Sequence, residues 1–279
     1  NGTASYTWYT TQASGGWHNL TCKIGDNSTL YYNASIPQKE VLVKIRRPLI
    51  IDSINVQHPS IYRNDSFNPH ATNITVHVKD ANIGNAENAT VYFYNLTDLI
   101  GNCTTNANGY CSLLNFNVDD SIDPTLYTIY INATRPQNED SDTNTTTITI
   151  KGILFTTILQ PPNNSVYSKS DFIPLKADVV SENGENLTEL NPDVKWYNET
   201  NLIAVGHDTS LPQPQVAAQK TGIHIFRAVA TKQYYDDGIA NVTVTITGLS
   251  DVVWVSPTGE IPYPNVFYPT CRVEDTESH

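Results

Sequence analysis

Short stretches of alternating apolar and polar residues recur along this chain at a spacing of about 100 residues, and this repetition limits the folds open to it. Clear examples are 73–79, 127–132 and 241–246. A side-chain period of two is typical of strands with one buried face. No segment has a convincing helical period, and Pro, Gly, Asn and Asp punctuate the strands at short intervals. The chain is therefore predicted to be all-β and built of β-sandwiches.

Equivalent strands can be matched between the repeats. An early strand that ends at proline occurs three times, at 54–59, 158–162 and 253–257. A late strand also occurs three times, at 16–22, 125–131 and 222–228. Each late strand carries a ring residue, and inward apolar positions follow it at two and four residues; the ring residues are His18, Tyr127 and His224.

This matching predicts two complete and two partial domains. Residues 1–47 contain late strands only, and residues 249–279 contain early strands only. Residues 48–151 and 152–248 contain a whole set. Because the chain lacks Met and starts at Asn1, it is expected to be a processed product or an internal piece.

Asparagine followed two residues later by Ser or Thr is far more frequent than composition explains. The 29 Asn and 51 Ser and Thr residues would give roughly five such acceptors by chance. The chain has 15 of them, none with Pro in the middle, which predicts N-glycosylation and passage outside the cell. They are Asn1, Asn19, Asn27, Asn33, Asn64, Asn73, Asn88, Asn95, Asn102, Asn132, Asn144, Asn163, Asn186, Asn198 and Asn241.

The four cysteines favour the same compartment, because disulfides persist outside the cytosol. Cys103 and Cys111 flank Asn106-Ala107-Asn108-Gly109, a strong hairpin turn. They are predicted to face one another across the two strands of this hairpin as a disulfide. The alternative is two separate buried thiols.

The run 91–95, with Ile100-Gly101, the turn 105–109 and the strand 126–129, resembles tandem immunoglobulin-like domains of prokaryotic surface proteins. These include bacterial Ig-like, PKD-like and CARDB-like modules, which are common in archaeal S-layer and adhesin-type proteins. The resemblance implies a tandem Ig-like architecture over nearly the whole chain. It implies no catalytic residue, since the family shares none.

Cys22 lies at an inward position of a late strand, and Cys271 lies at an inward position of the strand that follows an early strand. This pair resembles the disulfide between the two sheets of immunoglobulin domains. Two completions of the partial domains are open. Either the missing strands belong to a longer array, or residues 249–279 of one copy complete residues 1–47 of the next. No counterpart of Trp196-Tyr197 is identified for such a composite domain, which favours the longer array.

The sequence gives little support for nucleic-acid binding, membrane insertion, metal binding or catalysis. The net charge of −12 argues against nucleic acid, and no apolar run of about 20 residues could span a membrane. The seven His show no metal-binding spacing, and motifs for phosphate, dinucleotide or nucleophile sites are missing. The acidic stretches 119–123 and 139–142 are interpreted as solvated loops, with calcium at the first as the alternative. The chain is predicted to be no enzyme, to hold no catalytic or metal site, and to need no cofactor.

These features predict a structural segment of a heavily N-glycosylated extracellular filament, sheath or surface layer, and the family resemblance implies an archaeal source. Its expected partners are N-linked glycans and either identical copies or the continuation of the array. The alternative is the stalk of a cell-surface adhesin whose binding part lies outside this sequence.

Overall fold

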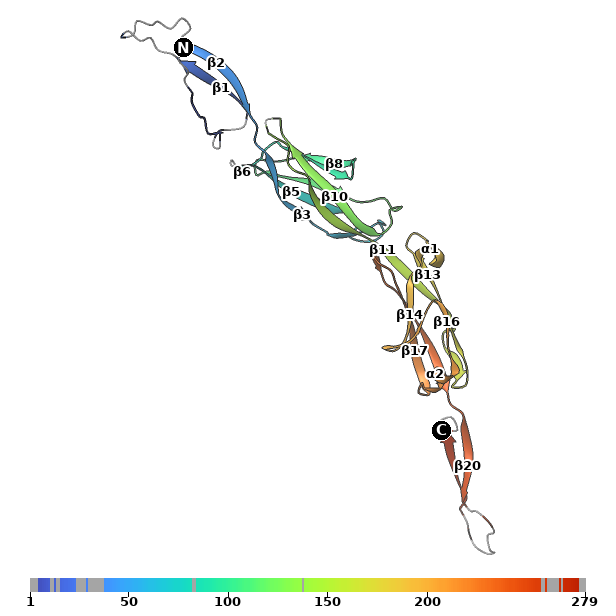
Figure 1. The fold of residues 1–279 in the computed structure, drawn as a ribbon. Coiled ribbons are helices and arrows are strands. Elements are labelled where there is room, and N and C mark those ends of the chain that lie inside the picture. Colours follow the sequence, from blue (N-terminus) through green and yellow to red (C-terminus); the bar gives the residue numbers. More distant parts are fainter. Residues whose placement is uncertain are drawn as a thin grey trace. The chain divides into compact units, whose positions relative to one another are not determined.

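The computed structural model describes residues 5–10, 13, 16–23, 29, 38–81, 84–136, 138–256, 259, 266 and 268–275. Nearly all regular structure is β-strand, and the chain divides into two units, Asn1–Ile150 and Lys151–His279 (Figure 1). The predicted all-β class is confirmed. Each unit contains one β-sandwich and one separate two-stranded hairpin.

The sandwich of the first unit has two sheets. One contains β3 (Leu49–Val56), β5 (Thr72–Asp80), β6 (Gly84–Asn85) and β9 (Tyr110–Phe116), with β5 between β3 and the other two. The other contains, in spatial order, β11 (Asn144–Gln160), β10 (Thr125–Thr134), β7 (Thr90–Asn95) and β8 (Asp98–Thr104). The short strand β4 (Ser60–Tyr62) also pairs with β11.

The sandwich of the second unit repeats this order. Its first sheet contains the C-terminal part of β11, β13 (Ile173–Ser181) and β16 (Asp208–Leu211). Its second sheet runs β12 (Ser165–Ser168), β19 (Gly238–Thr247), β17 (Gly222–Thr231), β14 (Asp193–Asn198) and β15 (Asn201–Val205). The two-residue strand β18 (Tyr235–Asp236) pairs in parallel with β11.

The packing of these sheets follows from the burial of every second side chain along each strand. In β5, Ile74, Val76 and Val78 are fully buried, and they share a core with Ile129 and Ile131 of β10. Each such side chain contributes about 1.5–3 kcal/mol on burial. The second sandwich has its own core, in which Trp196 is the largest fully buried side chain.

The strand order identifies the fold. In both sandwiches the first, second and fifth long strands form one sheet, and the third, fourth, sixth and seventh form the other. This division is that of immunoglobulin-like sandwiches. The chain is therefore a tandem of Ig-like β-sandwiches, as the sequence predicts.

Two antiparallel hairpins lie outside the sandwiches, one near each end of the sequence. The first pairs β1 (Gly16–Lys23) with β2 (Gln38–Ile45), and the second pairs β20 (Ser250–Ser256) with β21 (Thr270–Asp275). Each forms a two-stranded sheet of its own, blue and red in Figure 1.

Two one-turn helices, α1 (Leu187–Leu190) and α2 (Gln213–Ala217), were not predicted. Four or five residues are too few to show a helical period. A local signal was nevertheless present for α1, because Asn186 and Glu189 form a reciprocal capping box.

Candidate functional site

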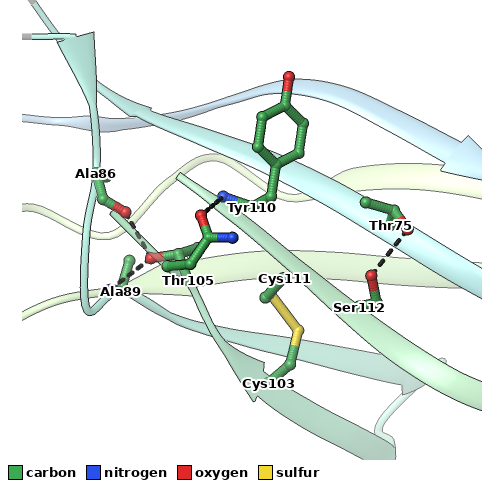
Figure 2. The surroundings of a disulfide bond; sticks show 9 residues. Thr75, Ala86, Ala89, Cys103, Thr105, Tyr110, Cys111 and Ser112 are labelled. Carbon is green, nitrogen blue, oxygen red and sulfur yellow. Dashed lines mark hydrogen bonds between the residues drawn. A yellow bond between two sulfur atoms is a disulfide. The ribbon is translucent and has the colours of Figure 1, made fainter. Parts of the chain in front are cut away.

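The disulfide between Cys103 and Cys111 is present, with the two Cα atoms 5.8 Å apart. Figure 2 shows it between β8 and β9. The predicted hairpin is wrong, because β8 pairs with β7 while β9 pairs with β5. The two strands diverge into opposite sheets after the turn, so the disulfide joins the two sheets rather than two paired strands.

Hydrogen bonds around the turn allow this divergence. The side chain of Asn106 accepts hydrogen bonds from the backbone N–H groups of Asn108 and Tyr110. The Thr105 hydroxyl donates to the Ala86 carbonyl and accepts from the Ala89 N–H, which fixes the strand before the turn (Figure 2). Together these bonds hold the turn against the neighbouring loop.

Removing the disulfide should destabilise the first sandwich alone. Loop-closure entropy for a separation of 8 residues predicts a loss of about 2.5 kcal/mol in the double variant Cys103→Ala/Cys111→Ala. Calorimetry should show one unfolding transition moving to lower temperature while the other stays in place. A shift of both transitions would contradict the assignment of the disulfide to one domain.

A buried ionic cluster centred on Asp80 lies in the first sandwich, next to the start of β3. Asp80 is 3% exposed and accepts hydrogen bonds from Arg135 and, at 2.9 Å, from Asn138 Nδ2. Arg47 Nη1 lies 3.9 Å from the other Asp80 oxygen and donates to the Ala81 carbonyl at 3.2 Å. The Arg47 guanidinium also donates to the Ala13 carbonyl. One carboxylate thus joins two arginines from distant parts of the unit.

A second polar network surrounds His77 on β5. Its Nδ1 lies 2.9 Å from Asp52 Oδ2, and its Nε2 lies 3.0 Å from Asn85 Oδ1. The ring stacks on Tyr110 with centroids 4.2 Å apart. Lys79 Nζ lies 2.7 Å from the other Asp52 oxygen. Both ring nitrogens of His77 therefore have a polar partner, as is expected for a buried histidine with a structural role.

This network should make the stability of the first sandwich depend on pH. Hydrogen bonds from Lys79 and then His77 lower the pKa of Asp52 below its usual value of 3.8. A lowered pKa stabilises the fold above the unfolded value, and the contribution is lost as pH falls through the folded value. The difference in unfolding free energy between wild type and Asp52→Asn should thus be present at neutral pH and vanish in acid. Urea titrations at both pH values would test this, and a difference that persists in acid would contradict it.

The acidic stretches form no recognisable cation site. Asp119 accepts a hydrogen bond from the Ser121 N–H at 2.8 Å, and its bonds to Ser121 lower its pKa. Among the described residues, no group of three His, Cys, Asp or Glu side chains is arranged to hold a metal ion. Likewise, no helix in the described part of the chain is long and apolar enough to cross a membrane.

Twelve of the predicted glycosylation acceptors lie in the described part of the chain; Asn1, Asn27 and Asn33 lie outside it. Asn19, Asn88, Asn102, Asn163, Asn186 and Asn241 are exposed, and Asn64, Asn73, Asn95, Asn132 and Asn144 are half-buried. Asn198 is different, since it is 7% exposed and its Nδ2 donates to Gln219 Oε1 at 2.7 Å. Because this amide is buried in the folded chain, we expect Asn198 to carry no glycan, in contrast to the prediction from the sequence.

The two remaining cysteines are exposed thiols on the terminal hairpins. Cys22 lies on β1 opposite Lys39, and Cys271 lies on β21 opposite Trp254. Their predicted equivalence to core positions of the two sandwiches stays a prediction. The sequence analysis overlooked two features: the Asp80 cluster, and Trp8, whose ring lies 5.4 Å from that of His18.

No family model and no curated protein matches this chain. Solved structures with a similar fold include fibronectin(III)-like modules of CbhA from Clostridium thermocellum, at 12% identity over 70% of this chain and 94% of that chain, with a TM-score of 0.32. Sidekick-1 immunoglobulin domains 1–4 match at 10% identity over 72% of this chain and 49% of that chain, with a TM-score of 0.44. Titin domains I67–I69 match at 9% identity over 77% and 71%, with a TM-score of 0.42. At these levels the matches carry no functional argument.

Proposed function

We propose that this chain is a load-bearing spacer in a heavily N-glycosylated extracellular array, such as a filament, sheath or surface layer. The observation that carries the proposal is the pairing of an early strand with the last strand of each sandwich. In the second sandwich β12 pairs in parallel with β19, from Ser165 opposite Val244 to Ser168 opposite Thr247. In the first, β4 pairs with β11.

The parallel pairing of the early strand β12 with the last strand β19 determines how the second sandwich responds to tension. Tension pulls β12 and β19 along their own axes in opposite directions, so their hydrogen bonds are sheared together rather than opened one by one. The Asn164 N–H donates to Thr243 O at 2.8 Å, and the Lys169 N–H donates to Thr247 O at 3.1 Å, extending the ladder at both ends. Such a domain is suited to transmitting load.

Other features support an extracellular site for this spacer. The exposed acceptors for N-glycans would hydrate the surface and hinder proteolysis. The disulfide ties the two sheets of the first sandwich together, and disulfides persist outside the cytosol. The stalk of a cell-surface adhesin would use the same properties, and it remains the second candidate.

Single-molecule pulling on the 279-residue chain tests the mechanical role. We expect two main unfolding events, each releasing roughly 30 nm of chain. Reducing Cys103–Cys111 should lengthen one event by roughly 2 nm, because the two Cα atoms, held 5.8 Å apart by the disulfide, are then free to separate to the full length of the chain between them.

A matched pair of variants isolates the shear ladder. Lys169→Pro removes the N–H that donates to Thr247 and should lower the unfolding force of the second sandwich, whereas Lys169→Ala keeps the N–H and should leave the force unchanged. Unfolding of both wild-type domains at forces too low to separate from the baseline would contradict a load-bearing role.

A further inference from the structure

We propose that the two terminal hairpins are complementary parts of one composite Ig-like sandwich formed between successive copies of this chain and sealed by a Cys22–Cys271 disulfide. The β20–β21 hairpin of one copy would cover the β1–β2 hairpin of the next. The inference rests on the proposed function, since it names the partner that extends the array.

The β1–β2 hairpin has the register of the last two strands of each sandwich. The ring residue of each late strand lies opposite an apolar residue of the next strand: His18 opposite Val43, Tyr127 opposite Ile148, and His224 opposite Val244. Counting four residues on, Cys22 takes the place of Ile131 and Ala228. Both of those residues are fully buried in the cores of their sandwiches.

The β20–β21 hairpin has the register of the first two strands. Trp254 lies opposite Cys271, as Ile54 lies opposite Val76 and Ile158 opposite Ala177. Val76 shares a core with Ile131, and Ala177 shares one with Ala228. Cys271 and Cys22 therefore hold positions that belong to the same core in each complete sandwich.

Both hairpins expose the faces that the sandwiches bury. On the first, Leu20 is 37% exposed and Val41 57%, whereas their counterparts Phe226 and Val242 are 0% and 4% exposed. On the second, Val273 is 70% exposed, whereas Val78 and Val179 are fully buried. Two-stranded sheets with an open apolar face are marginally stable in water and gain from a second layer.

Trp8 supplies the central-strand residue that this composite otherwise lacks. The dipeptide Trp8-Tyr9 repeats Trp196-Tyr197 and corresponds to Phe93-Tyr94. Phe93 lies opposite Ile131, and Trp196 lies opposite Ala228, which are the counterparts of Cys22.

The structure already places Trp8 on the open face of the first hairpin. Its ring meets that of His18 edge to face, and it helps to line a groove of about 680 Å³ with Leu20, Cys22 and Val41. A core tryptophan beside a disulfide between the sheets is a recurrent feature of immunoglobulin domains. Trp8 would have this position beside the Cys22–Cys271 disulfide.

Charge complementarity favours a second copy as the occupant. Residues 1–46 carry four Lys and Arg against two Asp and Glu, a net charge of +2 within a chain of net charge −12. Arg47 is left out because it lies against Asp80 in the first sandwich. Residues 249–279 carry one Arg against five Asp and Glu, a net charge of −4. Opposite charges on the two segments draw different ends of two copies together and disfavour pairing of like ends.

The covalent step is an ordinary thiol oxidation. The S–H bonds of Cys22 and Cys271 are lost, one S–S bond forms, and two electrons and two protons pass to a small-molecule disulfide such as oxidised glutathione. The oxidant is reduced to two thiols through a mixed-disulfide intermediate.

Mixing two single-cysteine variants of the full chain tests the proposal. Cys22→Ser retains the thiol of Cys271, and Cys271→Ser retains that of Cys22. In a glutathione redox buffer, the mixture should give about tenfold more covalent dimer on non-reducing electrophoresis than either variant alone. Wild type should give a ladder of oligomers, and digestion should yield the Cys22–Cys271 linked peptide.

Two further measurements separate docking from random oxidation. Trp8→Ala should slow dimer formation in the mixture about tenfold by weakening the docked state, whereas the exposed Tyr9→Ala should not. Raising the salt concentration should slow it as well, since the segments attract through their charges. Equal dimer yields from each variant alone, or a Cys22–Cys271 link within single chains, would overturn the proposal.

Failure here is distinguishable from failure of the spacer role. If the chain stays monomeric but both sandwiches resist force, it remains a load-bearing spacer and the proposal of a second copy is wrong. If copies join but the sandwiches unfold at low force, the composite domain stands and the load-bearing role is wrong.

Discussion

Replacing Asp80 by Asn is expected to lower the unfolding free energy of the first sandwich by about 3 kcal/mol or more. Asp80 is 3% exposed and bonds to Arg135 and Asn138, with Arg47 alongside at 3.9 Å. The variant keeps the shape of the side chain but removes its charge. Two arginines would then be left partly buried without their anion, which is more costly than losing a surface pair.

Calorimetry should detect this loss as a fall of roughly 10–20 °C in one of two transitions, given a domain of about 100 residues. Asp65→Asn is the matched control, because Asp65 is exposed in the same sandwich and its change should be within about 0.5 kcal/mol. Equal effects of the two substitutions would show that the cluster around Asp80 does not stabilise the domain.

Replacing Trp196 by Ala is expected to destabilise the second sandwich by about 3–5 kcal/mol. Trp196 is fully buried on β14, and its Nε1–H donates to the Gly206 carbonyl at 3.0 Å. The substitution leaves a cavity in the core and an unpaired carbonyl. Trp196→Phe should lose less, because the phenyl ring fills most of the cavity.

The same substitution at an exposed tryptophan provides the control. Trp17 is 66% exposed on β1, and Trp17→Ala should change the stability of the second sandwich by less than about 0.5 kcal/mol. Chemical denaturation followed by far-UV circular dichroism would measure both. A loss below about 1 kcal/mol for Trp196→Ala would contradict its place at the centre of this core.

Local patterning was sufficient to predict the strands, their equivalence between repeats and the two cores. Alternation in 73–79 and 241–246 reports directly which side chains are buried, because a strand has only two faces. Contacts between residues far apart in the sequence could not be predicted in this way.

Three features illustrate that limit. The turn 106–109 was identified, but whether the strand after it returns to the same sheet depends on pairing with β5, far away in sequence. Asn198 has the acceptor motif, but its amide is buried by partners at Gln219 and His224. The Asp80 cluster joins Asp80 to Arg135 and Asn138, which are 55 and 58 positions away, and no local pattern marks such a set.

The most direct test of the extracellular spacer is a peptide map of the native protein under non-reducing conditions, with glycan occupancy read at each acceptor. The account predicts a Cys103–Cys111 linked peptide, glycans at exposed acceptors such as Asn88, Asn102 and Asn241, and none at the buried Asn198. Free thiols at Cys103 and Cys111 together with unmodified asparagines throughout would contradict it, because such a chain would not have passed through a glycosylating, oxidising compartment.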